Sequence, residues 1–223
     1  MLDSLSQHAL QIIIMAVALL ISIIGHEIMH GLVAYHYGDP TAKHAGRLSI
    51  NPIKHIDLLG SIIVPVVLFI AQAPFLFGWA KPVPIDIRFI IHSRGYGAAI
   101  GVALAGVSYN LALALFASML LFSDILDLSM QSLVGSISVL LLLYLIQYNV
   151  VLCVFNLLPI PPLDGSQALL FAALKFRLYT FAKFLESIAP YGMLIVFVIL
   201  FIPSLSSILF YPATMLLRFL LPL

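Results

Sequence analysis

Charged residues are scarce in this chain. Asp, Glu, Lys and Arg make up 9% of its 223 residues, whereas a soluble domain carries about 25%. No cluster of basic residues suggests a nucleic-acid partner. The single cysteine, Cys153, excludes an intrachain disulfide and a cysteine-rich metal site. These absences argue against a soluble domain, a disulfide scaffold and a nucleic-acid-binding protein.

Hydrophobic residues make up 63% of the chain and gather in long runs. Runs of this length cross a bilayer as helices, so the sequence predicts an all-α polytopic membrane protein. We expect one domain over residues 1–223, with a core at about residues 5–186 and one or two membrane helices at about 190–223. The apolar runs are Leu5–Tyr37, Leu58–Phe77, Tyr96–Phe122, Leu133–Leu158 and Tyr191–Leu223.

Two interruptions in the C-terminal half leave alternatives open. Pro203 and Pro212 break the last apolar run, which fits either a helical hairpin folded at Pro203 or one kinked helix. Ahead of that run, Ser166–Glu186 mixes apolar and basic residues. This stretch is typical of an interfacial helix at a membrane surface, and a plain linker helix is the alternative.

The second apolar run is flanked on both sides by basic loops. Three basic residues precede it and three follow it: Lys43, Arg47 and Lys54, then Lys81, Arg88 and Arg94. If Leu58–Phe77 crossed the membrane, these loops would lie on opposite faces, against the positive-inside rule. Pro65 and Pro74 also break the run. We therefore predict a re-entrant or broken segment that begins and ends on the cytoplasmic face, with full crossing as the alternative.

The first apolar run contains the sequence His-Glu-Ile-Met-His at positions 26–30. Two histidines four residues apart lie on one face of a helix, so His26 and His30 can bind one zinc ion. Glu27 can then take a proton from the attacking water. Ionisable residues at membrane depth are costly and mark a functional site. The pattern predicts zinc-dependent hydrolysis within a bilayer.

A catalytic zinc ion takes three protein ligands and keeps one position for water. The other candidates are less suitable: His44, His55 and His92 lie in basic loops, Asp39 and Asp57 lie in or beside loops, and His36 is about 80° from the ligand face of the helix. Asp164 follows a proline-rich stretch, which can aim a carboxylate back at a helix. Its two roles left open are zinc ligand and N-cap of the next helix.

The HExxH motif and three further segments together resemble the site-2 protease family of intramembrane zinc metalloproteases, in particular its short bacterial and archaeal members without a PDZ domain. Besides the HExxH motif, they are Gly46–Asp57, Phe77–Pro84 and Asn156–Gly165 (NLLPIPPLDG). The resemblance covers about residues 26–165. It implies a three-helix catalytic core made of the HExxH helix, a helix near 96–122 and a helix near 133–158. It also implies a prokaryotic inner-membrane enzyme, open to the cytoplasm, that cleaves transmembrane protein substrates.

The resemblance assigns roles residue by residue. His26 and His30 match the zinc-binding histidines, Glu27 matches the general base, and Asp164 matches the third ligand of one Zn²⁺ ion. Asn156 matches an asparagine that holds the substrate or stabilises the oxyanion.

One family stretch is only partly matched. The sequence Ala105–Asn110 is similar to a segment that reads Ala-Gly-Pro before an asparagine, but Val107 replaces the proline. The local backbone bend is therefore not guaranteed by the sequence. Asn110 remains a candidate for substrate contact or for packing.

A helical substrate hides its peptide bonds, so it must unwind before hydrolysis. We expect that the broken segment Gly60–Phe77 could offer a strand edge to the unwound peptide. A regulatory membrane protein is a further partner to consider, beside the substrate and the lipid. Two other functions stay open: a zinc transporter or sensor that uses the same ligands without hydrolysis, and a helix bundle in which Glu27 relays protons.

Overall fold

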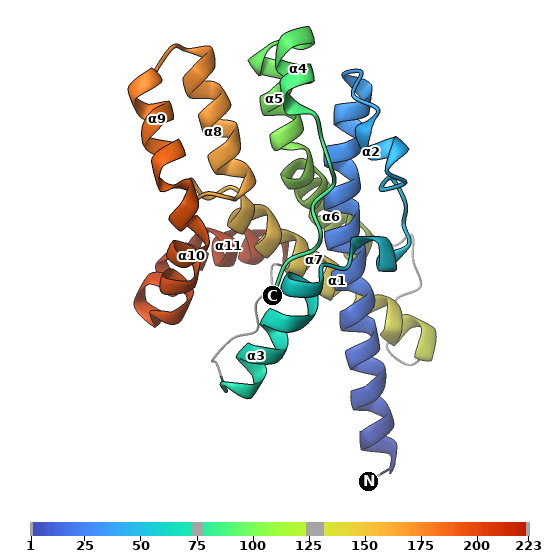
Figure 1. Ribbon diagram of the computed structural model, residues 1–223. Helices are drawn as coiled ribbons and strands as arrows, with labels where there is room; N and C mark the ends of the chain where they lie inside the picture. Colours follow the sequence, from blue (N-terminus) through green and yellow to red (C-terminus); the bar gives the residue numbers. More distant parts are fainter. Residues whose placement is uncertain (1, 73–77, 124–131, 222–223) are drawn as a thin grey trace.

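The computed structural model describes residues 2–72, 78–123 and 132–221, which fold as helices joined by loops, without a strand in these ranges (Figure 1). Predictions at Pro74, at Phe77, in the 124–131 loop and at residues 222–223 lie outside the described residues. The long elements are α1 (Leu2–His36), α5 (Tyr96–Ala103), α6 (Ala105–Leu121), α7 (Leu133–Asn156), α8 (Asp164–Lys175), α9 (Tyr179–Ile188), α10 (Gly192–Phe201) and α11 (Pro203–Leu220). The short ones are α2 (Thr41–His44), η1 (Pro52–His55), η2 (Leu58–Ile63), α3 (Val64–Ile70), α4 (Ile87–Arg94) and η3 (Ala189–Tyr191).

The helices confirm a polytopic all-α membrane protein. Three stretches are long and apolar enough to cross a membrane, namely Gln7–His36, Leu133–Asn156 and Tyr179–Phe201, and the bent pair α5–α6 can form a fourth. Large apolar side chains point outward along them, including Ile12, which is 65% exposed, and Val134, which is 74% exposed. So much exposed apolar surface suits contact with lipid.

The centre of the protein is a three-helix core of α1, α6 and α7, as predicted. These three helices pack pairwise on one another. Their shared interior includes Ala18 of α1, Ala114 and Ala117 of α6, and Ile146 and Val150 of α7, all buried. Alanines at these contacts let the helix backbones approach closely, which is how helices gain packing energy within lipid.

The chain bends between α5 and α6. The two helices meet at Leu104 with an angle of 44°. The bend is present although Val107 replaces the proline of the related pattern, and it lies three residues earlier. Carbonyls in the last turn of a helix lack intrahelical partners. The bend therefore makes a carbonyl of α5 available to the α1 helix.

In the described residues, the second apolar run does not form a helix long enough to cross a membrane. The helices η2 and α3 contain 6 and 7 residues, about 20 Å at 1.5 Å per residue, too short for a hydrocarbon core of about 30 Å. The chain then comes back, because the Trp79 N–H donates to the Gly60 carbonyl at 3.1 Å and the Lys81 N–H donates to the His55 carbonyl at 2.9 Å. Both flanks therefore lie side by side, as a re-entrant segment requires.

The outgoing and returning limbs touch through two glycines. A Cβ atom on Gly60 would lie 2.4 Å from the Trp79 indole, and one on Gly78 would lie 2.5 Å from the Gly60 carbonyl oxygen. We call residues 78–86 the return limb; it runs from the region of α3 along α1 to α4 (Figure 1). The strand-edge hypothesis is wrong for Leu58–Ile70, because these residues are helical.

Cysteine labelling tests this topology in the membrane. Lys54 and Arg88 are exposed on the two flanks of the re-entrant segment. Single cysteines at these positions, placed in a Cys153→Ser background, should react with a membrane-impermeant reagent from the same side of the bilayer. Labelling from opposite sides would mean that Leu58–Phe77 crosses the membrane.

The stretch predicted as one interfacial helix, Ser166–Glu186, is divided between α8 and α9. The break falls at Arg177, whose φ of 59° is left-handed and ends α8. The helix α9 then continues through η3 into α10, so the last apolar region begins at Tyr179 rather than Tyr191. A break at Ile202 separates α10 from α11, so the last apolar run is two helices that meet at Pro203 and not one continuous helix.

Candidate metal centre

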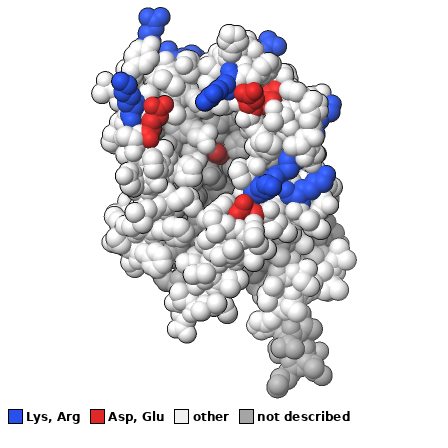
Figure 2. Space-filling model, viewed as in Figure 1, with Lys and Arg blue, Asp and Glu red and all other residues white. Residues whose placement is uncertain are grey.

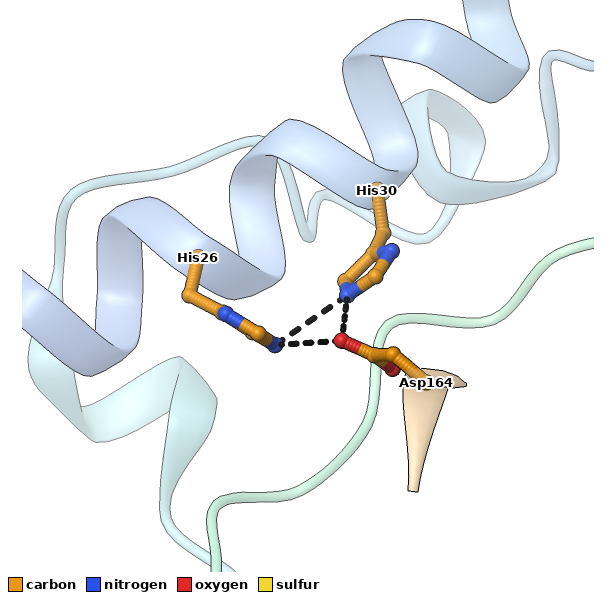
Figure 3. Close-up of side chains that lie close together, drawn as sticks. All are labelled: His26, His30 and Asp164. Atoms are coloured by element: carbon orange, nitrogen blue, oxygen red, sulfur yellow. Dashed lines mark hydrogen bonds and ion pairs between the residues drawn. The ribbon is translucent and has the colours of Figure 1, made fainter. Parts of the chain in front are cut away.

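Three side chains from distant parts of the sequence converge in the core. His26 and His30 come from α1, and Asp164 comes from the start of α8 (Figure 3). The His26 Nε2 and His30 Nε2 atoms are 3.2 Å apart. The Asp164 Oδ2 atom lies 3.2 Å from the first and 3.3 Å from the second. One metal ion could contact all three atoms.

The loop after α7 brings Asp164 to the histidines. The helix α8 begins at Asp164, and the N-cap residue is Leu163, which makes no side-chain capping bond. The N-cap alternative for Asp164 is therefore wrong. The loop fits against the end of α7 so closely that a Cβ atom on Gly165 would lie 2.2 Å from the Leu157 carbonyl oxygen. Only glycine allows this approach without displacing the helix start.

Both imidazoles have one nitrogen occupied by the protein. His26 Nδ1 lies 2.6 Å from Asn110 Oδ1, and His30 Nδ1 lies 2.7 Å from the carbonyl oxygen of Val102. A carbonyl oxygen only accepts hydrogen bonds, so both Nδ1 atoms carry the proton and donate it. In the neutral imidazoles the Nε2 atoms then carry lone pairs, and both point at Asp164.

The third group in the cluster is an anion. Burial raises the pKa of the Asp164 carboxyl, but the neighbouring His26 and His30 imidazoles lower it to about 2. The Asp164 Oδ2 atom is buried and accepts no protein hydrogen bond. Two lone pairs and a carboxylate oxygen at contact distance fit a zinc ion well, since zinc prefers imidazole and carboxylate ligands.

A glycine leaves room beside these three atoms. A Cβ atom on Gly106, just after the α5–α6 bend, would lie 2.5 Å from His26 Nε2 and 2.5 Å from His30 Nε2. Any larger residue would therefore occupy space next to the metal-binding nitrogens. The absence of a side chain at position 106 therefore keeps this space open.

Gly106→Ala should lower zinc affinity, because the new methyl group would push on both ligand nitrogens. We expect a loss of at least about 10-fold, as for other disturbances next to metal ligands. Gly97→Ala is the matched control, since a Cβ atom there would meet only Lys175 Nζ at 3.6 Å. Chelator competition measures both variants. Equal zinc affinity for Gly106→Ala and wild type would show that the metal does not bind here.

Glu27 is held by the return limb. Its Oε2 atom accepts the Val83 N–H at 2.9 Å. Val83 stands between Pro82 and Pro84, which have no N–H, so it provides the only backbone donor of these three residues. The contact fixes one carboxylate oxygen of Glu27.

The return limb is itself tied at both ends. The Arg47 Nη2 group donates to the Lys81 carbonyl at 2.6 Å, and the Asp86 N–H donates to Asp39 Oδ2 at 2.7 Å. Burial raises the pKa of Asp39, but hydrogen bonds from the Thr41 side chain and from the Thr41 and Asp86 N–H groups lower it overall. Asp39 is thus an anion at neutral pH that anchors the limb to the end of α1.

A hollow opens on the face shown in Figure 2, with part of an acidic residue visible at its bottom. The Asp164 side chain is 15% exposed and those of His26 and His30 are 10% and 11% exposed, so water has access to the cluster. On this face the Lys and Arg side chains gather at the upper end of the molecule, around the hollow (Figure 2). The basic side chains thus lie mainly at one end of the molecule, as expected if the basic loops of the sequence share one side of the membrane.

The two asparagines predicted from sequence occupy different environments. Asn110 is fully buried beside His26 and contacts no open surface. Asn156 is the last residue of α7, and its Nδ2 group donates to the Leu152 carbonyl of the same helix at 3.0 Å. Among the described residues, His26, His30 and Asp164 are the only cluster of metal-binding side chains.

Sequence reasoning missed three contributors to the site. Asn149 of α7 and Ser22 of α1 are fully buried and hydrogen-bonded to Asn110 or to each other. Gly106 leaves open the space beside His26 Nε2 and His30 Nε2. Ser22 precedes His26 by four residues, so it shares the ligand face of α1. That spacing, and the cost of an amide at position 149 within an apolar run, were the available signals.

Comparison with known proteins found one informative relative. The chain is 34% identical over 212 residues to the protein named "Putative zinc metalloprotease YwhC" of Bacillus subtilis (strain 168), and the match covers 89% of this chain and 84% of that protein. No family model and no solved structure matches the chain.

Proposed function

The chain belongs to the zinc metalloprotease family of Bacillus subtilis YwhC, and from this premise we propose that it is an intramembrane endopeptidase of the site-2 protease type. Its reaction is the hydrolysis of peptide bonds within or next to transmembrane segments of other membrane proteins. Its physiological role is regulated intramembrane proteolysis.

The observation that carries the proposal is the position of the metal cluster. His26 and His30 lie within Gln7–His36, a stretch long and apolar enough to cross a membrane. A soluble peptide stays in water and does not reach this depth, whereas a transmembrane helix already lies there. The partial exposure of the Asp164, His26 and His30 side chains supports access of water to the same place.

The residues divide the chemistry between them. His26, His30 and Asp164 would hold zinc, which when bound would supply the Lewis acid for the scissile carbonyl and the attacking water. Glu27 takes the proton of the attacking water and passes it to the leaving amine. Asn156 donates an amide hydrogen to the oxyanion once the substrate draws it away from the Leu152 carbonyl.

The proposal includes a location and partners. We place the protein in a prokaryotic inner membrane with the basic loops and the hollow on the cytoplasmic side, following the distribution of Lys and Arg. Its partners are transmembrane substrates and the surrounding lipid, and a membrane protein that controls substrate access is a natural addition.

Reconstitution into liposomes tests the proposal. Purified protein should cleave a single-pass helical substrate only after zinc is restored to the metal-stripped sample, and product masses should place the cut within the apolar segment. A cut only in soluble, unfolded peptides would contradict intramembrane proteolysis. Zinc uptake by the same vesicles without cleavage would instead support a transporter, which uses the same ligands but needs no general base.

Asn156→Ala should reduce kcat by about 10²–10³, the range for loss of one oxyanion donor, with zinc content unchanged. Kinetics and metal analysis on the same preparation measure both quantities. Loss of zinc with normal turnover in the remaining zinc-bound fraction would show that Asn156 braces the Asp164 loop instead.

A further inference from the structure

A buried hydrogen-bond network lies behind His26, away from the metal. It joins three helices of the core through Ser22 of α1, Asn110 of α6 and Asn149 of α7, each with 0% exposure. Asn110 Nδ2 donates to Asn149 Oδ1 at 2.7 Å, and Asn149 Nδ2 donates to Ser22 Oγ at 2.7 Å. Polar groups this deep in an apolar bundle are unusual and generally serve function.

The network has a single consistent direction, because it ends on groups that can only accept. Asn149 Nδ2 lies 2.8 Å from the Leu145 carbonyl, so the amide nitrogen must face that way and Oδ1 must face Asn110. Asn110 Nδ2 is likewise fixed by Asn149 Oδ1 and by the Ser22 carbonyl at 3.2 Å. Asn110 Oδ1 therefore faces His26 Nδ1, which must carry the proton.

We infer that Asn149 is a positioning residue that acts through Asn110 to hold His26 in the tautomer that binds zinc. A reversed Asn110 amide would present hydrogens to Nδ1, and the imidazole would then keep its proton on Nε2, where the metal binds. Asn149 makes this reversal unfavourable, since its Oδ1 atom would then oppose the Asn110 oxygen. His30 does not depend on the network, because its Nδ1 proton goes to the Val102 carbonyl.

The inference depends on the zinc site and not on intramembrane cleavage. Its readouts are zinc affinity and the protonation of His26, both measured on the purified full-length protein without substrate. If the protein does not cleave transmembrane substrates, the role of Asn149 at His26 is unaffected. If Asn149 does not affect zinc binding, the proposed proteolysis is unaffected.

A double-mutant cycle on the zinc dissociation constant tests the coupling. Asn110→Leu should weaken zinc binding about 10- to 100-fold, the range for loss of a partner behind a metal-bound histidine. Asn149→Leu should weaken it by about 10-fold. The double variant should bind zinc no more weakly than Asn110→Leu alone, because Asn149 acts only through Asn110.

Tyr144→Phe is the matched control. Tyr144 of α7 accepts a hydrogen bond from Gln11 of α1 at 2.7 Å, so the change removes another polar contact between the same two helices. Zinc affinity should stay unchanged in this variant. Additive losses in the cycle, or equal losses in Tyr144→Phe and Asn149→Leu, would reduce Asn149 to a helix-packing residue and overturn the inference.

A measurement on the wild-type chain covers the case in which the leucine variants do not fold. Nitrogen-15 NMR of histidine-labelled, zinc-loaded protein, with the His26 signals assigned by their absence in His26→Gln, should show a protonated Nδ1 and a metal-bound Nε2. Zinc on Nδ1, or a proton on Nε2, would overturn the inference.

Discussion

Glu27→Gln should reduce the rate of proteolysis by about 10²–10⁴, the usual contribution of a positioned general base, while the zinc content remains that of wild type. The amide is nearly the same size as the carboxylate, and its oxygen can still accept the Val83 N–H that holds Glu27 at 2.9 Å. The metal ligands are untouched. Only the ability to take a proton is lost.

Cleavage of a transmembrane substrate and metal analysis should be run on the same preparation. Glu186→Gln is a suitable control, because Glu186 is an exposed glutamate on α9, outside the metal cluster. It should cleave at the wild-type rate. Near wild-type cleavage by Glu27→Gln would remove the general base from the mechanism and with it the assignment as a metalloprotease of this type.

Asp164→Ala should lose both zinc and activity. Only two imidazoles would remain, and the two Nε2 atoms, 3.2 Å apart, would lack the anion that complements a divalent ion. We expect zinc affinity to fall by more than about 100-fold, beyond the loss produced by removing a partner behind a ligand. Gln167→Ala, an exposed position on the same helix α8, should retain full zinc occupancy. Full occupancy in Asp164→Ala would reopen the search for the third ligand.

Much of this site follows from short-range patterns in the sequence. The four-residue spacing of His26 and His30 fixes their common face, because helix geometry is regular. The basic residues on both flanks of Leu58–Phe77 indicate a segment that returns, since charge distribution follows membrane sides. Both patterns depend on local spacing or composition and therefore can be read without a structure.

The remaining features depend on how distant helices meet. The bend at Leu104 makes the Val102 carbonyl available to His30, and it brings Gly106 against the ligand nitrogens. Neither of these two contacts can be predicted from the local sequence. The replacement of the proline by Val107 also left the bend itself in doubt. Asn149 lies 39 residues from Asn110, so its role becomes visible only when α6 and α7 are packed together.

The strand-edge hypothesis shows a different limit of sequence reasoning. A short apolar run with prolines is compatible with strand or helix, and here Leu58–Ile70 is helical while the non-helical part is the return limb. The Val83 N–H of that limb is engaged with Glu27. Pro65 lies in the first turn of α3, directly after η2, and a proline is tolerated in the first turn of a helix.

Zinc K-edge X-ray absorption on the purified protein, combined with metal analysis, tests most directly the claim that His26, His30 and Asp164 form a zinc site. We predict one zinc ion per chain with nitrogen and oxygen ligands only, two of them imidazoles, and loss of the carboxylate contribution in Asp164→Asn. A metal-free protein after zinc loading, sulfur in the ligand shell, or a spectrum unchanged by Asp164→Asn would contradict the site described here.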